Sequence, residues 1–254
     1  MSAFINSPTD QFEINTYTST SSAVADTSWT SITTFGVYTV IVFAVIVGTH
    51  TTTIGNNGTT PTKWSIGTES TFSTIQNMVY SQIGVSGQQF FPLIYVTFVF
   101  ITISNTFSMI PYNFATMAQT IFTIATSSII WTGVTITGFY NFKLGYFGTF
   151  VPAGTTTPTV PVTVIIETTS YTARSVSTGT RTGSNITAGH TTTVITGGTI
   201  FDFMSSGAIF FVTGFTPTAT VTGIMCTECA IATIQAYVFC ITACSYTKEA
   251  IYTH

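Results

Sequence analysis

Residues 90–140 contain no Asp, Glu, Lys or Arg, and this block limits what the chain can fold into more than any other feature. Its apolar stretch YVTFVFITI at 95–103 is continuous, as in a buried helix. The whole chain has 5 Lys+Arg and 8 Asp+Glu, so 5% of its residues are charged, against roughly 25% in soluble domains. Thirteen formal charges cannot cover a water-soluble globule of this size, and a net charge of -3 gives no basis for nucleic-acid binding. The composition therefore favours a membrane protein over a soluble enzyme.

Apolar runs and turn residues predict an all-α, polytopic membrane protein. The first run, 35–48, reaches about 20 residues if the flanking Thr count as apolar, which is enough to span the hydrocarbon layer. We expect a loop at 54–69, a surface helix at 70–86, a hairpin of spanning helices at 90–109 and 114–139, a wet connector at 141–163, and two long helices at 164–197 and 203–250 divided by Gly197-Gly198.

We interpret the chain, 1–254, as one membrane domain. Its parts are an N-terminal segment (1–33), peripheral helices (34–163) and the long helix pair (164–250). A transmembrane β-barrel is the structural alternative, because Thr, Val, Ile and Tyr favour strands. It would require apolar and polar residues to alternate, and the continuous apolar block at 95–103 favours helices instead.

Threonine is unusually common and leucine unusually rare: the chain has 57 Thr and 2 Leu, Leu93 and Leu144. Leu is normally among the commonest residues. Some mitochondrial codes read the CUN codons as Thr, so we hypothesise that many of these Thr are Leu read with the wrong code. Peptide mass spectrometry that finds Thr at Thr178, Thr180 and Thr182 would refute this hypothesis.

Polar residues in the first long helix share one stripe. At 100° per residue, Glu167, Arg174, Thr178, Arg181 and Asn185 fall within about 60° of one another. Ionisable groups in a membrane helix persist only where they face protein or a water-filled cavity. A Glu–Arg pair that only holds helices together is the alternative interpretation, chiefly for Glu167 and Arg174. His190 falls on another face, where we expect it to meet a different helix.

The second long helix carries Glu228, Gln235, Thr242 and Glu249 at seven-residue intervals, which forms a second polar stripe. Its four cysteines fall on the opposite face: Cys226, Cys229, Cys240 and Cys244. On a straight helix the outer two lie about 27 Å apart, so they cannot converge on one tetrahedral ion. We therefore expect packing cysteines and predict neither a metal site nor a cofactor.

Five segments carry a resemblance to a known family. The longest is VIIETTSYTARSVSTGTRTGSNITAGH at 164–190, and the others are SPTDQFE at 7–13, SMIPY at 108–112, FVPAGT at 150–155 and IQAY at 234–237. With the suspect Thr read as Leu, they closely resemble the subunit a family of the mitochondrial F-type ATP synthase, from about residue 7 to His254. Asp202 and Ala236 depart from the family pattern.

The resemblance implies a proton-translocating stator subunit that is not catalytic alone. Its two long tilted helices would pack on a rotating ring of c-subunits, and two offset half-channels would carry protons to and from the ring carboxylates. Arg181 maps to the indispensable arginine between the half-channels, and Gly179 and Gly183 beside it would leave room for the ring. Residues expected in the proton path are Glu167 at the matrix exit, His190 and Glu228 in the intermembrane-space half-channel, and Asn185, Gln235 and Glu249, while Arg174 and Asp202 are expected to be structural.

The resemblance also implies the mitochondrial inner membrane, a lipid bilayer, and peripheral-stalk and other membrane-sector subunits as surroundings. It implies a short leader, 1–6, with Ser7 as the first residue after its removal. The alternative function is a Thr-rich surface or adhesive protein, favoured by the printed composition and by N-glycosylation patterns at Asn57 and Asn185. An unrelated carrier or redox membrane protein is a third class, but no His pair at haem spacing supports it.

Overall fold

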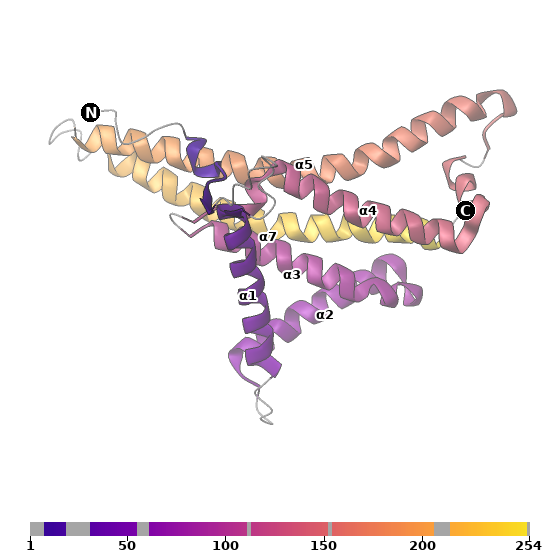
Figure 1. The fold of residues 1–254 in the computed structure, drawn as a ribbon, viewed down its shortest axis with the longest axis horizontal. Helices are drawn as coiled ribbons and strands as arrows, with labels where there is room; N and C mark the ends of the chain where they lie inside the picture. Colours follow the sequence, from indigo (N-terminus) through magenta and orange to yellow (C-terminus); the bar gives the residue numbers. More distant parts are fainter. Residues whose placement is uncertain are drawn as a thin grey trace, which may run out of the picture.

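The computed structural model describes residues 8–18, 31–54, 61–110, 113–151, 154–205 and 214–252. These residues form six α-helices, with short 3-10 turns between them (Figure 1). The helices are α1 (Thr34–Ile54), α2 (Lys63–Ile83), α3 (Phe91–Ser108), α4 (Thr120–Phe142), α5 (Val160–Ser205) and α7 (Phe215–Ile251). The expected leader 1–6, Ser7 and the Pro111-Tyr112 break lie outside the described residues.

The long helices α5 and α7 extend along the length of the molecule, α4 packs beside both over part of it, and α3 packs against α7 (Figure 1). α1 leaves this helix layer at a steep angle, with α2 beside its far end (Figure 1). One core cluster joins the helices where they meet, with Val42 of α1, Ile101 of α3 and Phe239 of α7 among its buried members. The layer therefore brings α5 and α7 together along most of their length.

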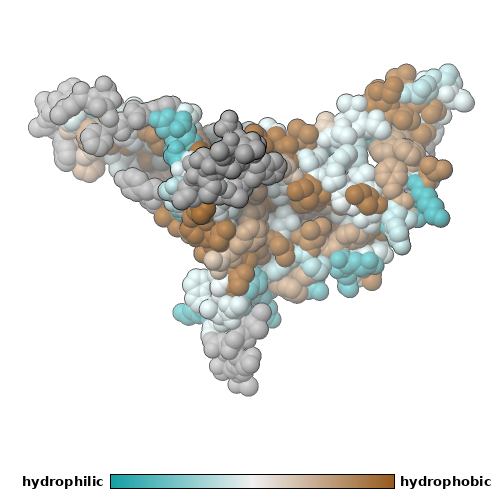
Figure 2. Space-filling view, in the orientation of Figure 1, coloured by the Kyte–Doolittle hydropathy of each residue, from teal (hydrophilic) through white to brown (hydrophobic). Residues whose placement is uncertain are grey.

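Within the described residues, four segments are long and apolar enough to cross a membrane. They are Thr34–Thr53, Val85–Ser108, Thr120–Phe150 and Phe215–Ile251. Large apolar side chains cover much of the outer surface: Val40, Ile121 and Ile136 are each more than two-thirds exposed, and brown surface extends over the helix layer in Figure 2. The all-α, polytopic architecture is confirmed, and the described residues contain only one short strand pair.

The helix α5 is not among these four segments, although it is the longest helix. Its many Thr reduce its hydropathy. Their hydroxyls mostly donate to the carbonyl four residues earlier, as Thr180 does to Val176 (2.8 Å) and Thr192 to Ala188 (2.7 Å). Because these hydroxyls are hydrogen-bonded within the helix, Thr side chains can face lipid in α5. The same positions could equally hold Leu, so the pattern does not decide between the two residues. The Leu interpretation stays a prediction.

The local predictions were wrong at four places. α5 passes through Gly197-Gly198 and ends at Ser205, because glycine is tolerated within long membrane helices. The second long helix, expected from 203, begins at Phe215 as α7. α2 begins at Lys63 rather than at 70, since the Thr62 side chain caps the Ser65 N–H at 3.3 Å. Part of the expected wet connector is helical, a 3-10 helix (η4) at Lys143–Phe150.

Two short strands were also not predicted. They are β1 (Thr16–Thr18) and β2 (Ile32–Thr33), which pair antiparallel. A 3-10 turn, η1 (Asp10–Phe12), precedes β1. This N-terminal segment lies against the helix layer, where Phe12 packs on the core cluster.

Candidate functional site

The two polar stripes meet along the seam between α5 and α7. Asn185 Nδ2 donates to Gln235 Oε1 at 3.1 Å, and Gln235 Nε2 donates to Thr182 Oγ1 at 3.1 Å. Toward one end of the seam, Thr193 Oγ1 donates to Glu228 Oε1 at 3.0 Å. Residue numbers rise on α5 as they fall on α7, which is the register of an antiparallel pair. Glu228 and Gln235, which are seven residues apart, both lie on the face of α7 that contacts α5.

The other end of the seam holds an ion pair. Arg174 Nη1 lies 2.8 Å from Glu249 Oε1, and its guanidinium lies 5.8 Å from the ring centroid of Tyr246. The two paired side chains are 40% and 38% exposed. Arg174 therefore links α5 to α7, as expected of a structural residue, and Glu249 is its partner in this structure.

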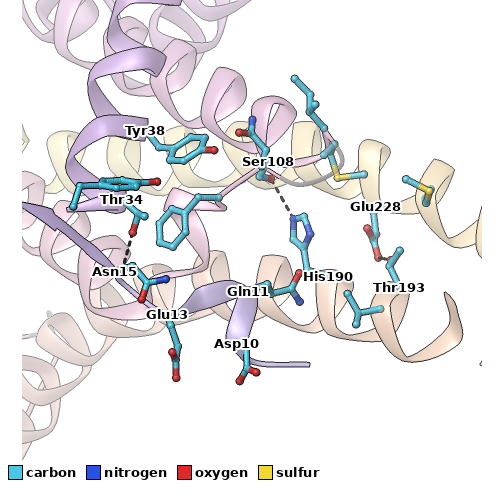
Figure 3. A pocket seen from close by; sticks show the side chains of 17 residues that line it. Asp10, Gln11, Glu13, Asn15, Thr34, Tyr38, Ser108, His190, Thr193 and Glu228 are labelled. Carbon is cyan, nitrogen blue, oxygen red and sulfur yellow. Dashed lines mark hydrogen bonds between the residues drawn. The ribbon is translucent and has the colours of Figure 1, made fainter. Parts of the chain in front are cut away.

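A cavity of about 550 Å³ opens beside His190 and Glu228 (Figure 3). Its walls come from the N-terminal segment, α1, the end of α3, α5 and α7. Figure 3 shows Asp10, Gln11 and Glu13 on the N-terminal side, with Glu228 and Thr193 on the other. We call it the outer cavity. Three carboxylates and a histidine make it polar enough to hold water.

A second cavity of about 480 Å³ lies further along the seam, and we call it the inner cavity. It shares Met109, His190 and Glu228 with the outer cavity and reaches Asn185 and Gln235. Its other lining residues are mostly apolar, including Ile186, Ile224 and Ile231. The two cavities together lead from the N-terminal carboxylates to the Asn185–Gln235 pair, and they meet at His190 and Glu228.

His190 stands where several segments converge, as its separate helix face predicted. Its Nε2 lies 3.4 Å from Ser108 Oγ, and its ring meets Phe12 edge-on, with centroids 6.3 Å apart. The carbonyl of Phe12 accepts a hydrogen bond from Gln119 Nε2 at 2.7 Å. Sequence patterns predicted no role for Ser108, Phe12 or Gln119, although Ser108 lies in the SMIPY match and Phe12 lies in the SPTDQFE match.

Arg181 lines neither cavity. It is exposed on the outer face of α5, in an open groove with Ala173, Ser177 and Thr180. No carboxylate among the described residues forms a salt bridge with it. Glu167 is half-buried, and Asp202 is exposed near the end of α5. The structure therefore separates Arg181 and Glu167 from the residues that line the cavities.

The prediction for Gly179 and Gly183 was wrong, because both glycines face α4. A Cβ on Gly179 would lie 2.6 Å from Ile124 Cα, and one on Gly183 would lie 3.1 Å from Thr120 Cα. These glycines let α4 and α5 approach closely. Gly189 has a different neighbour, since a Cβ there would lie 2.9 Å from the Glu228 carboxylate.

The cysteines divide into two groups. Cys240 and Cys244 are fully buried in a cluster with Ile75 and Val79 of α2, so the packing role is confirmed for them. Cys226 and Cys229 are exposed on this chain.

Comparison with known proteins shows what the chain is similar to. A family model described as "ATP synthase A chain" matches residues 32–248. ATP synthase subunit a of Saccharomyces cerevisiae is 46% identical over 255 residues, covering 100% of this chain and 98% of the relative. ATP synthase subunit a of Yarrowia lipolytica is 43% identical over 255 residues, covering 100% of both chains. The protein of the same name from Kluyveromyces lactis is 44% identical over 255 residues, again covering 100% of both.

Proposed function

Because the chain belongs to the ATP synthase subunit a family, the proton-translocating stator subunits of F-type ATP synthases, we propose a route for protons along the α5–α7 seam. The chain is a membrane-sector subunit and does not hold the site of ATP synthesis. It is a multi-pass protein of the mitochondrial inner membrane and associates with other ATP synthase subunits. The family match replaces the surface-protein and carrier alternatives.

The outer and inner cavities form the half-channel that opens to the intermembrane space. Protons enter past Asp10 and Glu13, reach His190 and Glu228, and continue to the Asn185–Gln235 pair. Carboxylate and imidazole groups exchange protons readily near neutral pH. The observation that supports this route is the sharing of His190 and Glu228 by two cavities that end at Asn185 and Gln235.

Arg181 separates this half-channel from the exit path. Its guanidinium stays protonated and lies on the exposed face of α5, which is the face left for a ring of c-subunits. A ring carboxylate that is ionised in lipid costs several kcal/mol, whereas an ionised carboxylate opposite Arg181 is stabilised. Arg181 therefore favours release of the ring proton and blocks protons from crossing directly between the paths.

Glu167 lines the matrix exit. It precedes Arg181 by four helical turns, about 21 Å along α5, while His190 lies about 13 Å beyond Arg181. The two paths are thus offset along one helix, and a proton crosses the offset only on the rotating ring. Arg174 and Asp202 lie outside the route, and Arg174 joins the two helices through its ion pair with Glu249. The place of Glu249 in the proton path stays a prediction.

The test replaces Arg181 by Gln in the assembled complex, with Arg174→Gln as the matched control. We expect Arg181→Gln to abolish ATP synthesis driven by a proton gradient, while Arg174→Gln retains most of it. Proton leak through reconstituted vesicles should rise only in the first variant. ATP synthesis that survives Arg181→Gln unaltered would refute the role given to Arg181.

A further inference from the structure

A buried polar link on α3 lies at the wall of the outer cavity, and the proposed proton route gives it no role. It consists of Asn105 and Ser108, which are 0% and 2% exposed. Burying an amide or a hydroxyl costs free energy unless it is hydrogen-bonded. Their position in a spanning helix therefore calls for an explanation.

The link joins three helices. Asn105 Nδ2 donates to the backbone carbonyl of Ala232 on α7 at 3.1 Å, and Ser108 Oγ donates to the backbone carbonyl of Asn105, three residues earlier in α3, at 2.6 Å. On its other side, Ser108 Oγ lies 3.4 Å from His190 Nε2 on α5 (Figure 3). Ala232 lines the inner cavity one turn after Glu228. The link thus ends where the two cavities meet.

The hydrogen bonds fix which ring nitrogen of His190 carries a proton. A serine hydroxyl has one proton, and that of Ser108 is donated to the Asn105 carbonyl. Toward His190 the Ser108 oxygen can therefore only accept, so Nε2 must be the donor. A neutral imidazole has one donor and one acceptor, which leaves Nδ1 with the lone pair. No group of the described residues forms a hydrogen bond with Nδ1.

We propose that Ser108, whose hydroxyl proton is donated to the backbone carbonyl of Asn105, is a positioning residue that keeps His190 in the Nε2–H tautomer, so that protons arrive and leave at Nδ1. This rests on the proposed function, in which His190 relays protons. Nδ1 accepts a proton from a hydronium ion, which becomes water. The imidazolium then returns that proton from Nδ1 to the Glu228 carboxylate through cavity water, giving a neutral imidazole and a carboxylic acid. Nε2–H stays bonded to Ser108 throughout.

Other ionisable groups face the same cavity and must be considered in any pH profile. They are Asp10, Glu13 and Tyr17 of the N-terminal segment, Tyr38 of α1 and Glu228 of α7. None of them forms a hydrogen bond with Ser108, so a change in tautomer after substitution of Ser108 can be assigned to the lost acceptor.

The experiment compares Ser108→Ala with Ser127→Ala in the complete complex. Ser127 is an equally buried serine that donates to the Ser175 carbonyl at 2.8 Å, between α4 and α5 and away from the cavities. Ser108→Cys retains the volume if the Ala variant assembles poorly, and Ser108→Thr restores a hydroxyl. The readouts are the nitrogen-15 NMR signal of His190, identified by its loss in His190→Gln, and the pH profile of ATP-driven proton pumping.

We expect the Nε2–H signal in the parent complex and in Ser127→Ala, and a mixture of tautomers in Ser108→Ala and Ser108→Cys. Pumping should fall about twofold or more in these two variants, because only the Nε2–H fraction of His190 remains competent. Ser108→Thr should restore both readouts. An unchanged His190 signal in Ser108→Ala would overturn the inference. If His190→Gln pumped normally, the role of His190 in the proposed function would fail, and the NMR result would still decide the tautomer.

Discussion

Replacing Gly179 by Ala should force α4 and α5 apart. The new Cβ would lie 2.6 Å from Ile124 Cα and 2.9 Å from the Ile124 nitrogen, both of which are backbone atoms. Carbon atoms pack at about 3.5–4.0 Å, so the helices must separate by about 1 Å or bend. Overpacking of this kind costs about 1–3 kcal/mol. Ala itself stabilises a helix by about 0.8–1 kcal/mol relative to Gly, which offsets part of this cost.

The control is Gly133→Ala in α4, where a Cβ would meet nothing within 4 Å. It shows the helix-propensity gain alone, so the difference between the two variants measures the packing cost. The assay is thermal dissociation of the purified complex, in which each kcal/mol shifts the midpoint by about 2–4 °C for a domain of 150–250 residues. Gly179→Ala should dissociate at a lower temperature than Gly133→Ala. If the two variants dissociated at the same temperature and only Gly179→Ala impaired coupling, the packing of Gly179 against α4 would be refuted. Gly179 would then face the ring of c-subunits, as the resemblance implied.

Four further substitutions probe the seam, the cavities and the N-terminal turn. Arg174→Gln and Glu249→Gln should each destabilise the complex by only about 0.2–1 kcal/mol, because the pair is partly exposed, and a double-mutant cycle would measure the coupling. A loss of proton pumping in Glu249→Gln alone would instead place Glu249 in the proton path. Gly189→Ala should displace the Glu228 carboxylate, 2.9 Å from the new Cβ, and slow pumping with little change in dissociation temperature. Gln119→Leu should release the N-terminal turn at a cost of about 0.5–1.5 kcal/mol, seen as faster hydrogen exchange at residues 10–15, and unchanged exchange would contradict the anchoring role.

The Leu interpretation bears on two contacts of the seam. If Thr182 is Leu, Gln235 keeps Asn185 but loses its second partner. If Thr193 is Leu, Glu228 loses the hydroxyl that donates to it and faces cavity water instead. Neither change removes a residue of the proposed route. The Ser108–His190 link involves no threonine, so it holds under both interpretations.

Sequence patterns by themselves determined that this is a helical membrane protein whose polar residues lie on two stripes. The scarcity of charge excludes a soluble surface, and helical periodicity places Asn185 and Gln235 on the polar stripes of their own helices, because both effects act along a single helix. The family motifs added the role expected of Arg181. Helix ends were less certain, as at Gly197-Gly198, because a glycine pair weakens a helix without always ending it.

Only the tertiary structure decided which residues meet across helices. It paired Arg174 with Glu249, turned Gly179 and Gly183 toward α4, and brought the N-terminal turn and Ser108 to His190. These contacts join segments far apart in the chain, and no periodicity along one helix specifies the rotation of its neighbour. The proton route therefore depends on how the helices pack, although the residues that form it can be recognised along the chain.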